Sequence, residues 1–252
     1  MKKRRVLLLA LGCLLSAAQA RQLPDIQKSG KLVVATEGAF APFNHFEGKK
    51  LTGFEVELAE LVAKKMGLAI EWKTLGFDAL LTGLGQDRWD VAIASHGITD
   101  ERAKAVDFMA PHYCSGGLIV TRDPNIRTAK DLAGKTVAVQ TGTSSLDNVK
   151  KVSAVKEVKN FPGDGDARAA LVTGRVDAWV SDRFVAIETL RKNPNLKLQA
   201  GELLFTERIA AAAAKGNTPL VQAWNKGLEA ILADGSYAAL SKRYFGEDVR
   251  CK

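Results

Sequence analysis

The sequence contains few residues that bind metals or form covalent cross-links. Its 252 residues include three cysteines and three histidines, and their scattered positions match no metal-ligand spacing. The glycine-containing loop at residues 140–145 lacks the lysine–hydroxyl pair of a nucleotide-binding P-loop. We therefore expect no metal ion and no cofactor.

Long apolar runs are equally scarce. The one extended run, residues 6–18, has about 13 residues, fewer than the roughly 20 that a membrane-spanning helix needs. Four basic residues precede it, and residues 18–20 (Ala-Gln-Ala) have the small-x-small pattern of a cleavage site. We therefore expect residues 1–20 to be a signal peptide cleaved after Ala20, and the mature chain to be soluble and periplasmic. Cys13 lies inside the apolar run rather than after it, so lipidation stays open as a less favoured alternative.

Charge of one sign is not concentrated anywhere in the chain. The formal net charge is +8, but four basic residues lie in the expected signal peptide, which leaves about +4 on the mature chain. Acidic and basic residues are interspersed without a block of five or six like charges. So small an excess sits easily on a solvated surface, and a nucleic-acid partner is therefore not expected.

Two cysteines, Cys114 and Cys251, remain after removal of the signal peptide. An even number of cysteines in an exported protein is compatible with a disulfide, because the compartment is oxidising. The sequence therefore predicts a Cys114–Cys251 bridge, which would tie the C-terminal end to the segment after Tyr113.

The apolar residues alternate between strand-like and helical spacing, and this order occurs twice. The first half has predicted strands and helices in turn at 31–35, 54–66, 69–72, 80–84 and 91–94, and the second half at 136–139, 144–151, 155–158, 166–173 and 178–180. A further strand is predicted at 209–214, followed by helices through 220–232 and 237–244. Such alternation favours parallel sheets flanked by helices, and its repetition favours two of them. The predicted fold class is therefore α/β, with a mostly parallel sheet in each half.

Ligands of open α/β sheets bind beyond the carboxyl ends of the strands, and two charged residues stand there. Arg102 lies in the first turn of a helix that Thr99 would cap, where it can bind a carboxylate through a planar fork or simply belong to a surface helix. Asp182 can bind an ammonium group or cap the helix that follows. Together, Arg102 and Asp182 offer one partner to each end of an amino-acid zwitterion.

Other residues in these loops also have two interpretations. Thr143 and Ser144 follow a glycine and open a helix, either as an anion-binding turn or as ordinary helix caps. Phe40 and Phe77 can form the walls of a ligand site or pack in the core.

Several short motifs occur together in one order and spacing. They are Glu37-Gly38-Ala39-Phe40-Ala41-Pro42-Phe43, Gly53-Phe54-Glu55, Phe77-Asp78-Ala79-Leu80, Ile98-Thr99-Asp100-Glu101-Arg102, Gln140-Thr141-Gly142-Thr143, and Gly174-Arg175-Val176-Asp177-Ala178 with Asp182. With these motifs the chain resembles the polar amino-acid-binding proteins of ABC importers, the type II periplasmic solute-binding proteins of bacterial extracellular solute-binding family 3. The resemblance covers essentially the whole mature chain.

The resemblance implies a two-lobed periplasmic-binding-protein-like fold with a two-segment hinge. The first lobe would comprise residues 21–114 and 209–252, and the second residues 115–208. The lobes would close over a free amino acid, and the protein would deliver it to the permease of an ABC importer. It would act as a monomer and not as an enzyme.

The resemblance also implies a role for each candidate residue. Arg102 would bind the ligand carboxylate with help from the Gly97 backbone and from Thr143 and Ser144, and Asp182 would bind the α-ammonium. The aromatic residues would wall the ligand side chain. The predicted site as a whole is Glu37, Phe40, Phe77, Ser95, Gly97, Arg102, Gln140, Thr143, Ser144 and Asp182, with His96 as a less certain member.

Two neighbouring positions depart from the family pattern. Gly97 stands where relatives often carry a hydroxyl residue, so a carboxylate contact there would come from the backbone alone. His96 is unusual beside it, and is either a packed, hydrogen-bonded structural residue or a specificity or pH-sensing residue. Glu37 favours a cationic amino acid over other polar ones, unless its carboxylate bonds the backbone of its own loop.

Two other functions stay open at this stage. Periplasmic cyclohexadienyl dehydratases, which act on prephenate or arogenate, resemble the same family. Such an enzyme needs a general acid in the pocket, and Glu37 is the only spare acid that the sequence makes evident. A sensory amino-acid-binding module cannot be distinguished from a transport component by these motifs.

Overall fold

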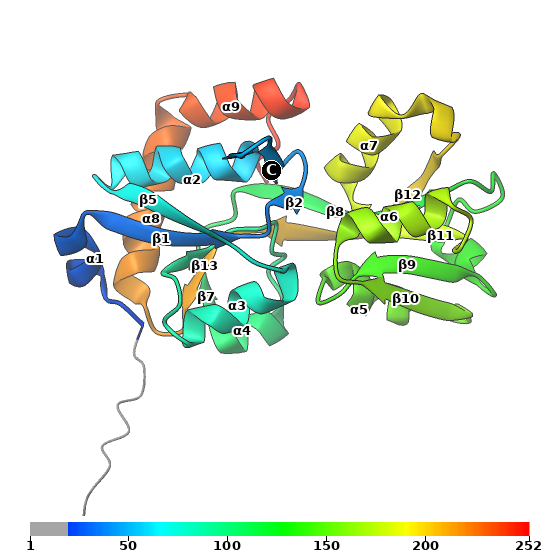
Figure 1. Cartoon of the computed structure of the whole chain (residues 1–252), viewed down its shortest axis with the longest axis horizontal. Coiled ribbons are helices and arrows are strands. Elements are labelled where there is room, and N and C mark those ends of the chain that lie inside the picture. The colour runs from blue at the N-terminus through cyan, green and yellow to red at the C-terminus, as the bar shows by residue number, and fades with distance from the viewer. Residues whose placement is uncertain (1–19, 252) are drawn as a thin grey trace, which may run out of the picture.

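The protein consists of two α/β lobes that lie side by side, each built around a five-stranded sheet (Figure 1). The computed structural model describes residues 20–251. All but the last residue of the expected signal peptide therefore lies outside the described residues. The predicted α/β class, with one sheet in each half of the fold, is confirmed.

The first lobe combines both ends of the described chain. Its helices and main-sheet strands are α1 (Leu23–Ser29), β1 (Lys31–Thr36), α2 (Phe54–Lys65), β5 (Ala69–Thr74), α3 (Phe77–Gly85), β6 (Val91–Ala92), α4 (Asp100–Ala105), β7 (Val106–Phe108), β13 (Ala212–Ala214), α8 (Thr218–Ala233) and α9 (Ser236–Phe245). The main sheet has the order β5-β1-β6-β13-β7. Strand β1 runs parallel to β5 and β6, whereas β13 runs antiparallel to β6 and β7. A small antiparallel sheet is formed by β2 (Ala39–Phe40), β3 (Asn44–Glu47) and β4 (Lys50–Thr52).

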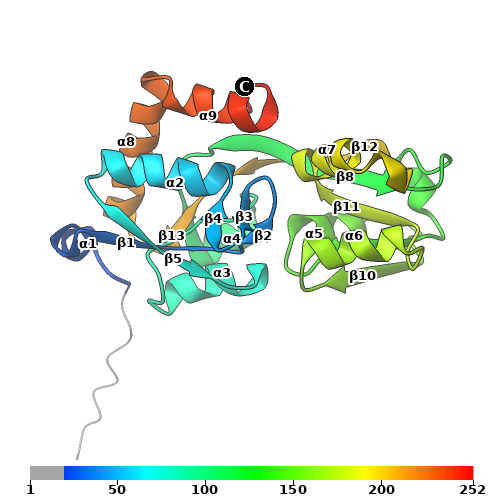
Figure 2. The same cartoon turned by 45° about the horizontal axis from the view of Figure 1, so that its top comes forward.

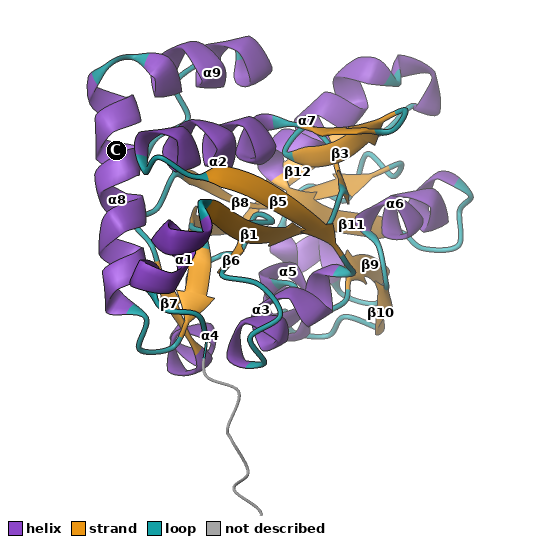
Figure 3. Ribbon diagram, turned by 60° about the vertical axis from the view of Figure 1, so that its left-hand side comes forward, coloured by secondary structure: helices purple, strands orange, loops and turns teal. Residues whose placement is uncertain are grey.

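The helices of this lobe form where apolar residues recur at helical spacing. In α2, Phe54, Leu58 and Val62 are completely buried, because a repeat of three to four residues places them on one face. Helix α8 buries Leu220 and Trp224 in the same way. The buried face of α2 packs against α8 and α9 (Figure 3).

The second lobe is formed by one continuous segment. Its elements are β8 (Tyr113–Thr121), a 3₁₀ turn (Ala129–Leu132), β9 (Thr136–Gln140), α5 (Ser144–Lys150), β10 (Glu157–Phe161), α6 (Asp164–Val172), β11 (Ala178–Asp182), α7 (Arg183–Lys192), a second 3₁₀ turn (Pro194–Leu196) and β12 (Gln199–Ile209). The sheet order is β10-β9-β11-β8-β12. As in the first lobe, a parallel part (β10, β9 and β11) adjoins an antiparallel edge formed by β8 and β12.

The two lobes are connected by the long strands β8 and β12 (Figure 2). These strands pair antiparallel from Tyr113 opposite Ile209 to Thr121 opposite Gln199. The chain therefore enters the second lobe along one strand and leaves it along the neighbouring one.

Two of the sequence-predicted strands depart most from the structure. The strand predicted at 209–214 is interrupted, because Ile209 still pairs with Tyr113 of the second sheet whereas Ala212 pairs with Ala92 of the first. The strand predicted at 155–158 is displaced and becomes β10. Val155 instead forms an isolated bridge with Ala133, so the alignment with β9 begins only at Glu157.

The predicted disulfide is present between Cys114, at the start of β8, and Cys251. The bridge joins residues 137 positions apart, and closing so large a loop restricts the unfolded chain far more than the folded one. We expect replacement of both cysteines by serine to lower the free energy of unfolding by about 2–4 kcal/mol, measured by urea denaturation.

Reduction with dithiothreitol serves as the matched control for this double variant. The reduced wild-type protein should lose as much stability as the double variant, and dithiothreitol should leave the double variant unchanged. A loss below about 0.5 kcal/mol in both cases would mean that the bridge does not contribute to stability as chain-entropy arguments predict.

Candidate functional site

A cavity lies between the two lobes. It is surrounded by segments at the carboxyl ends of strands of both sheets, the position at which α/β proteins bind ligands. Eight residues of the sequence-predicted site line it, namely Glu37, Phe40, Phe77, Ser95, Gln140, Thr143, Ser144 and Asp182. The other lining residues are Ala94, Ser145, Asp164, Val180, Ser181 and Glu207.

Ser95 is held at the cavity by a buried acidic residue. Its backbone has a φ of 57°, a left-handed conformation that costs about 1–3 kcal/mol outside glycine unless the surroundings impose it. The Ser95 backbone N–H donates to Glu55 Oε1 at 2.8 Å and its hydroxyl to Oε2 at 3.1 Å. Glu55 is itself fixed by Asn44 Nδ2 at 3.2 Å and by the ring of His112 at 3.0 Å. Because Glu55 and His112 are completely buried at their side chains, this cluster positions Ser95 rigidly.

Two aromatic residues contribute apolar surface to the cavity. Phe40 stacks on the buried Phe43 with ring centroids 5.9 Å apart. Phe77, the first residue of α3, stacks on His96 at 4.6 Å. Each ring therefore packs against another ring on one face and also borders the cavity. The two interpretations of Phe40 and Phe77, as core residues and as walls of a site, are thus compatible.

His96 lies behind Phe77 and does not line the cavity. It is 1% exposed, and burial lowers the pKa of its ring well below the usual value, so the ring is neutral. Among the described residues, neither ring nitrogen has a hydrogen-bond partner. His96 therefore packs in the structure as one of the two interpretations predicted. The hydrogen bond that this interpretation also predicted is absent among the described residues.

Arg102 lies beside the cavity rather than in its lining. Thr99 caps helix α4 as expected, accepting a hydrogen bond from the Arg102 backbone N–H at 3.2 Å. The guanidinium donates to the carbonyl oxygens of Gly97 at 2.8 Å and Gly142 at 2.9 Å, and it lies 5.7 Å from the Phe77 ring centroid. These two bonds use two of the five N–H donors of an arginine.

The lobes touch each other at Gly142. This residue has a φ of 76°, and a Cβ atom on it would lie 3.2 Å from Cβ of Asp78 in the first lobe. Only glycine combines that backbone conformation with so close an approach. A second contact between the lobes is the hydrogen bond from Gln140 Nε2 to Glu37 Oε1 at 2.6 Å.

The turn that opens α5 is capped by its own side chain. The Thr143 hydroxyl accepts from the Leu146 backbone N–H at 3.2 Å and donates to the Gln140 carbonyl at 2.7 Å. This is the ordinary cap that the sequence allowed. Ser144 is buried beside it and lines the cavity.

Asp182 both caps a helix and presents an acid to the cavity. Its Oδ1 accepts from the Phe184 backbone N–H at 2.8 Å, and its Oδ2 accepts from the Tyr113 hydroxyl at 3.3 Å. Burial raises the pKa of Asp182 to about 7. The two interpretations of Asp182 are therefore compatible, since the cap uses only one of its oxygens.

Two acids in the cavity were not recognised in the sequence. Asp164 begins α6 after β10 and accepts a hydrogen bond from the Trp179 ring N–H at 3.0 Å. Had the strand been placed at Glu157–Phe161, the strand-end rule would have indicated its loop. Glu207 lies on β12, and no local motif indicates it.

The cavity is rich in carboxyl groups. Burial raises the pKa of Glu37 to about 7 and that of Asp164 to about 6, and it also raises the pKa of Glu207. No lysine, arginine or histidine is among the described residues that line the cavity. Within residues 20–251, no group of three or more ligating side chains is arranged to hold a metal ion. The described lining residues therefore present four carboxyl groups and no cationic side chain to the cavity.

Two α/β lobes joined by two strands, with a polar cavity between them, define a class of proteins that bind a small solute between their lobes. The family model for bacterial extracellular solute-binding proteins, family 3, matches residues 32–247. The chain belongs to this family.

Named relatives agree with this assignment. The chain is 35% identical to the L-cystine-binding protein TcyJ of Escherichia coli K12, over 93% of this chain and 90% of that protein. It is 39% identical to the solved structure of an ancestral arginine-binding protein bound to arginine, with a TM-score of 0.83 over 86% of this chain and 99% of that one. The arginine-, lysine-, histidine-binding protein ArtJ of Geobacillus stearothermophilus is 33% identical, with a TM-score of 0.83 over 86% and 96% of the two chains.

These findings confirm the family expected from the motifs. The relatives are binding proteins, so the protein is a solute-binding protein and the dehydratase alternative is not favoured. In the part of the chain that the structure describes, no helix has both the length and the apolar character needed to cross a membrane.

Proposed function

We propose that the protein captures an amino acid in the cavity between its lobes and delivers it to the permease of an ABC importer. The observation that carries this proposal is the arrangement of charge. Arg102 lies beside the cavity as a cation, and Asp182 lines the cavity as an acid from the other lobe. Relatives that are named as cystine-binding and arginine-binding proteins support an amino acid as the ligand.

The energetics favour a ligand with both charged ends. A hydrogen bond to a charged group contributes roughly 1.5–3 kcal/mol, whereas a buried charge that loses its partner costs roughly 3–5 kcal/mol. A ligand without an ammonium group would leave Asp182 unpaired, and one without a carboxylate would leave Arg102 unpaired. Sugars and simple carboxylic acids are therefore disfavoured.

The remaining site residues complete the binding model. Phe40 and Phe77 would hold the ligand side chain between their rings, and Ser95 would contact the ligand from its fixed turn. The Gly97 backbone would contact the carboxylate, with Thr143 and Ser144 approaching from the other lobe. Gln140 would act by holding Glu37 in place, as its hydrogen bond does here.

The ligand is proposed to be a cationic amino acid such as arginine, lysine or ornithine. Four acids line the cavity, namely Glu37, Asp164, Asp182 and Glu207. Asp182 would take the α-ammonium group, and Glu37 the charge at the end of the side chain. Cystine fits this charge pattern less well, because its second carboxylate would meet acids and no lining cation.

Closure is proposed to occur by bending of β8 and β12, with residues 21–114 and 209–252 as one lobe and 115–208 as the other. The position of β8 and β12 between the two sheets supports this division. Closure would exclude water and strengthen the contacts to both ligand charges. The protein is proposed to act as a monomer.

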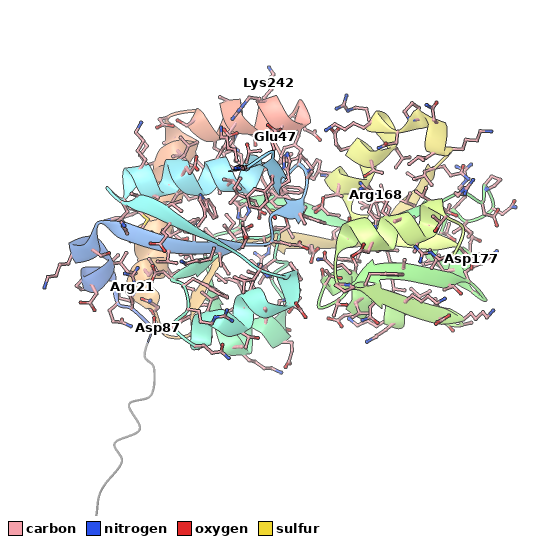
Figure 4. The ribbon with its side chains drawn as sticks, viewed as in Figure 1. Arg21, Glu47, Asp87, Arg168, Asp177 and Lys242 are labelled. Atoms are coloured by element: carbon pink, nitrogen blue, oxygen red, sulfur yellow. A yellow bond between two sulfur atoms is a disulfide. The ribbon has the colours of Figure 1, made fainter. Side chains whose placement is uncertain are left out.

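Export to the periplasm is proposed to proceed with cleavage after Ala20. The surroundings of Arg21 support this, because its backbone nitrogen lies 2.9 Å from Asp87 Oδ1 and its side chain pairs with Asp90 (Figure 4 shows Arg21 and Asp87 together). Cleavage would turn that nitrogen into an ammonium group, which a carboxylate holds more strongly than an amide.

A thermal-shift screen of all amino acids tests the proposed function. Ligand that binds only the folded protein adds about 2.7 kcal/mol at a hundredfold excess over Kd, which corresponds to a rise in Tm of roughly 5–10 °C in a chain of this size. We expect arginine, lysine or ornithine to give the largest rise.

Two arginine derivatives provide matched controls for this screen. Agmatine lacks the carboxylate and Nα-acetylarginine lacks the ammonium charge, so neither should raise Tm appreciably. If no amino acid raised Tm by more than about 1 °C, the proposed function would be wrong. A largest rise with acidic or apolar amino acids would refute the proposed ligand class.

A further inference from the structure

Glu207 is an acid of the cavity with an incompletely used carboxyl group. It lies on β12, opposite Ser115 of β8, and therefore on one of the two strands that join the lobes. Its Oε2 atom is buried and has no hydrogen-bond partner among the described residues, although Ser144 bonds to the carboxyl group closely enough to lower its pKa. A buried polar atom without a partner costs about 1–3 kcal/mol, so its retention in the lining of a ligand cavity indicates a partner that arrives with the ligand.

The carboxyl group of Glu207 occupies space that Gly97 leaves free. A Cβ atom built on Gly97 would lie 1.8 Å from Glu207 Oε2 and 2.7 Å from Glu207 Cδ. Any side chain at position 97 would thus displace this carboxyl group. Glycine at position 97 brings no side-chain oxygen of its own, and the polar oxygen in this space comes from Glu207 on β12.

The surroundings of Glu207 indicate which part of a ligand it meets. The positive charge of Arg102 acts on Glu207, and Arg102 holds the carbonyl of Gly97 at 2.8 Å. Glu207 therefore lies at the end of the cavity where the ligand carboxylate is proposed to bind. A carboxylate ligand next to an ionised Glu207 would be repelled, whereas a protonated carboxyl group has one O–H to donate.

Resting on the proposed function, we propose that Glu207 is a ligand-binding residue whose carboxyl group fills the space left free by Gly97 and donates a hydrogen bond to the ligand carboxylate. Burial raises the pKa of Glu207, whereas a hydrogen bond with Ser144 and the positive charge of Arg102 act in the opposite direction. Glycine at position 97 and glutamate at position 207 then form a matched pair, each of which requires the other.

Isothermal titration calorimetry of four variants with arginine as the probe tests this pairing. Glu207→Ala should weaken binding roughly tenfold to a hundredfold, the range expected for a hydrogen bond to a charged group. Glu207→Gln keeps the shape and a donor, and should stay within about threefold of the wild type. Glu202→Ala removes an exposed acid from the same strand and should leave the affinity unchanged.

A double variant tests whether the two residues share one place. Adding Gly97→Ser to Glu207→Ala supplies a hydroxyl in the vacated space and should recover most of the lost affinity. The proposal is overturned if Glu207→Ala binds as well as the wild type, if the double variant recovers nothing, or if Glu207→Gln is as weak as Glu207→Ala. That last result would mean that Glu207 acts as an anion toward an ammonium group.

The same measurements separate this proposal from the proposed function. Failure of the wild-type protein to bind any amino acid would refute the function itself. Binding by the wild type that is unaffected by Glu207→Ala would refute only the role of Glu207. Thermal melts without ligand verify that each variant is folded.

Discussion

Replacement of Arg102 by alanine is expected to abolish amino-acid binding. The ligand carboxylate would enter the closed site without its cation, at a cost of roughly 3–5 kcal/mol, which weakens Kd by more than a hundredfold. The variant also loses the hydrogen bond from Arg102 to the Gly142 carbonyl, one of the contacts between the lobes. Isothermal titration calorimetry with arginine measures the loss.

Arg175→Ala is the matched control for this prediction, because Arg175 is an exposed arginine that bonds Thr173 at 3.1 Å. It should bind with wild-type affinity. Circular dichroism should show both variants folded, since α4, which carries Arg102, has no buried residue. An Arg102→Ala affinity within threefold of the wild type would contradict the assignment of Arg102 as the carboxylate partner.

Binding is also expected to weaken at acidic pH through Asp182. Without ligand its pKa is raised to about 7, so the carboxyl group is neutral below that pH, and an ammonium group pairs only with the ionised form. Affinity should therefore fall as pH decreases from 8 to 5, by as much as about a hundredfold, since each pH unit below the pKa costs a factor of ten. Near pH 6.5, binding should release protons, which calorimetry in buffers of different ionisation enthalpy detects.

Asp182→Asn separates this effect from other titrations. The variant should bind weakly at both pH values and release fewer protons. Wild-type affinity that is equal at pH 5 and pH 8 would contradict the prediction. Glu37, whose pKa is also about 7, should contribute a further pH dependence for ligands with a charged side chain only, so comparison of lysine with glutamine isolates its part.

The stability of the unliganded protein should change with pH in the opposite direction. Folded Asp182 keeps its proton up to about pH 7, whereas the unfolded residue loses it near 3.8. The folded state therefore binds more protons in this interval, and the free energy of unfolding falls as pH rises through it. The contribution of Asp182 to the stability of the unliganded protein is thus largest where the ligand binds least well.

Much of the fold could be predicted because its strands and helices are encoded by local patterns. The runs that became β6 and β11 are short and apolar and are followed by helical spacing, so the strand-end rule led directly to Arg102 and Asp182. The family motifs added Glu37 and Gln140 and the roles of these residues. Local spacing was enough to predict a site residue wherever the same segment formed the strand and supplied the side chain.

The remainder depended on contacts between distant segments. Strand β12 alternates polar and apolar residues only irregularly, and it forms by pairing with β8 across the whole second lobe. Without that pairing, nothing in the sequence places Glu207 beside Gly97. The shift of β10 hid Asp164 in the same way, and the position of His96 behind Phe77 depends on how α3 packs against the first sheet.

The disulfide at the foot of β8 has a topological consequence. Because Cys114 and Cys251 flank the whole second lobe, the bridge turns that lobe and the C-terminal helices into a closed covalent ring. A single proteolytic cut anywhere between the two cysteines opens the ring but releases no fragment. In an environment that contains proteases, the two lobes of a molecule that has been cut once in its second lobe therefore stay covalently joined.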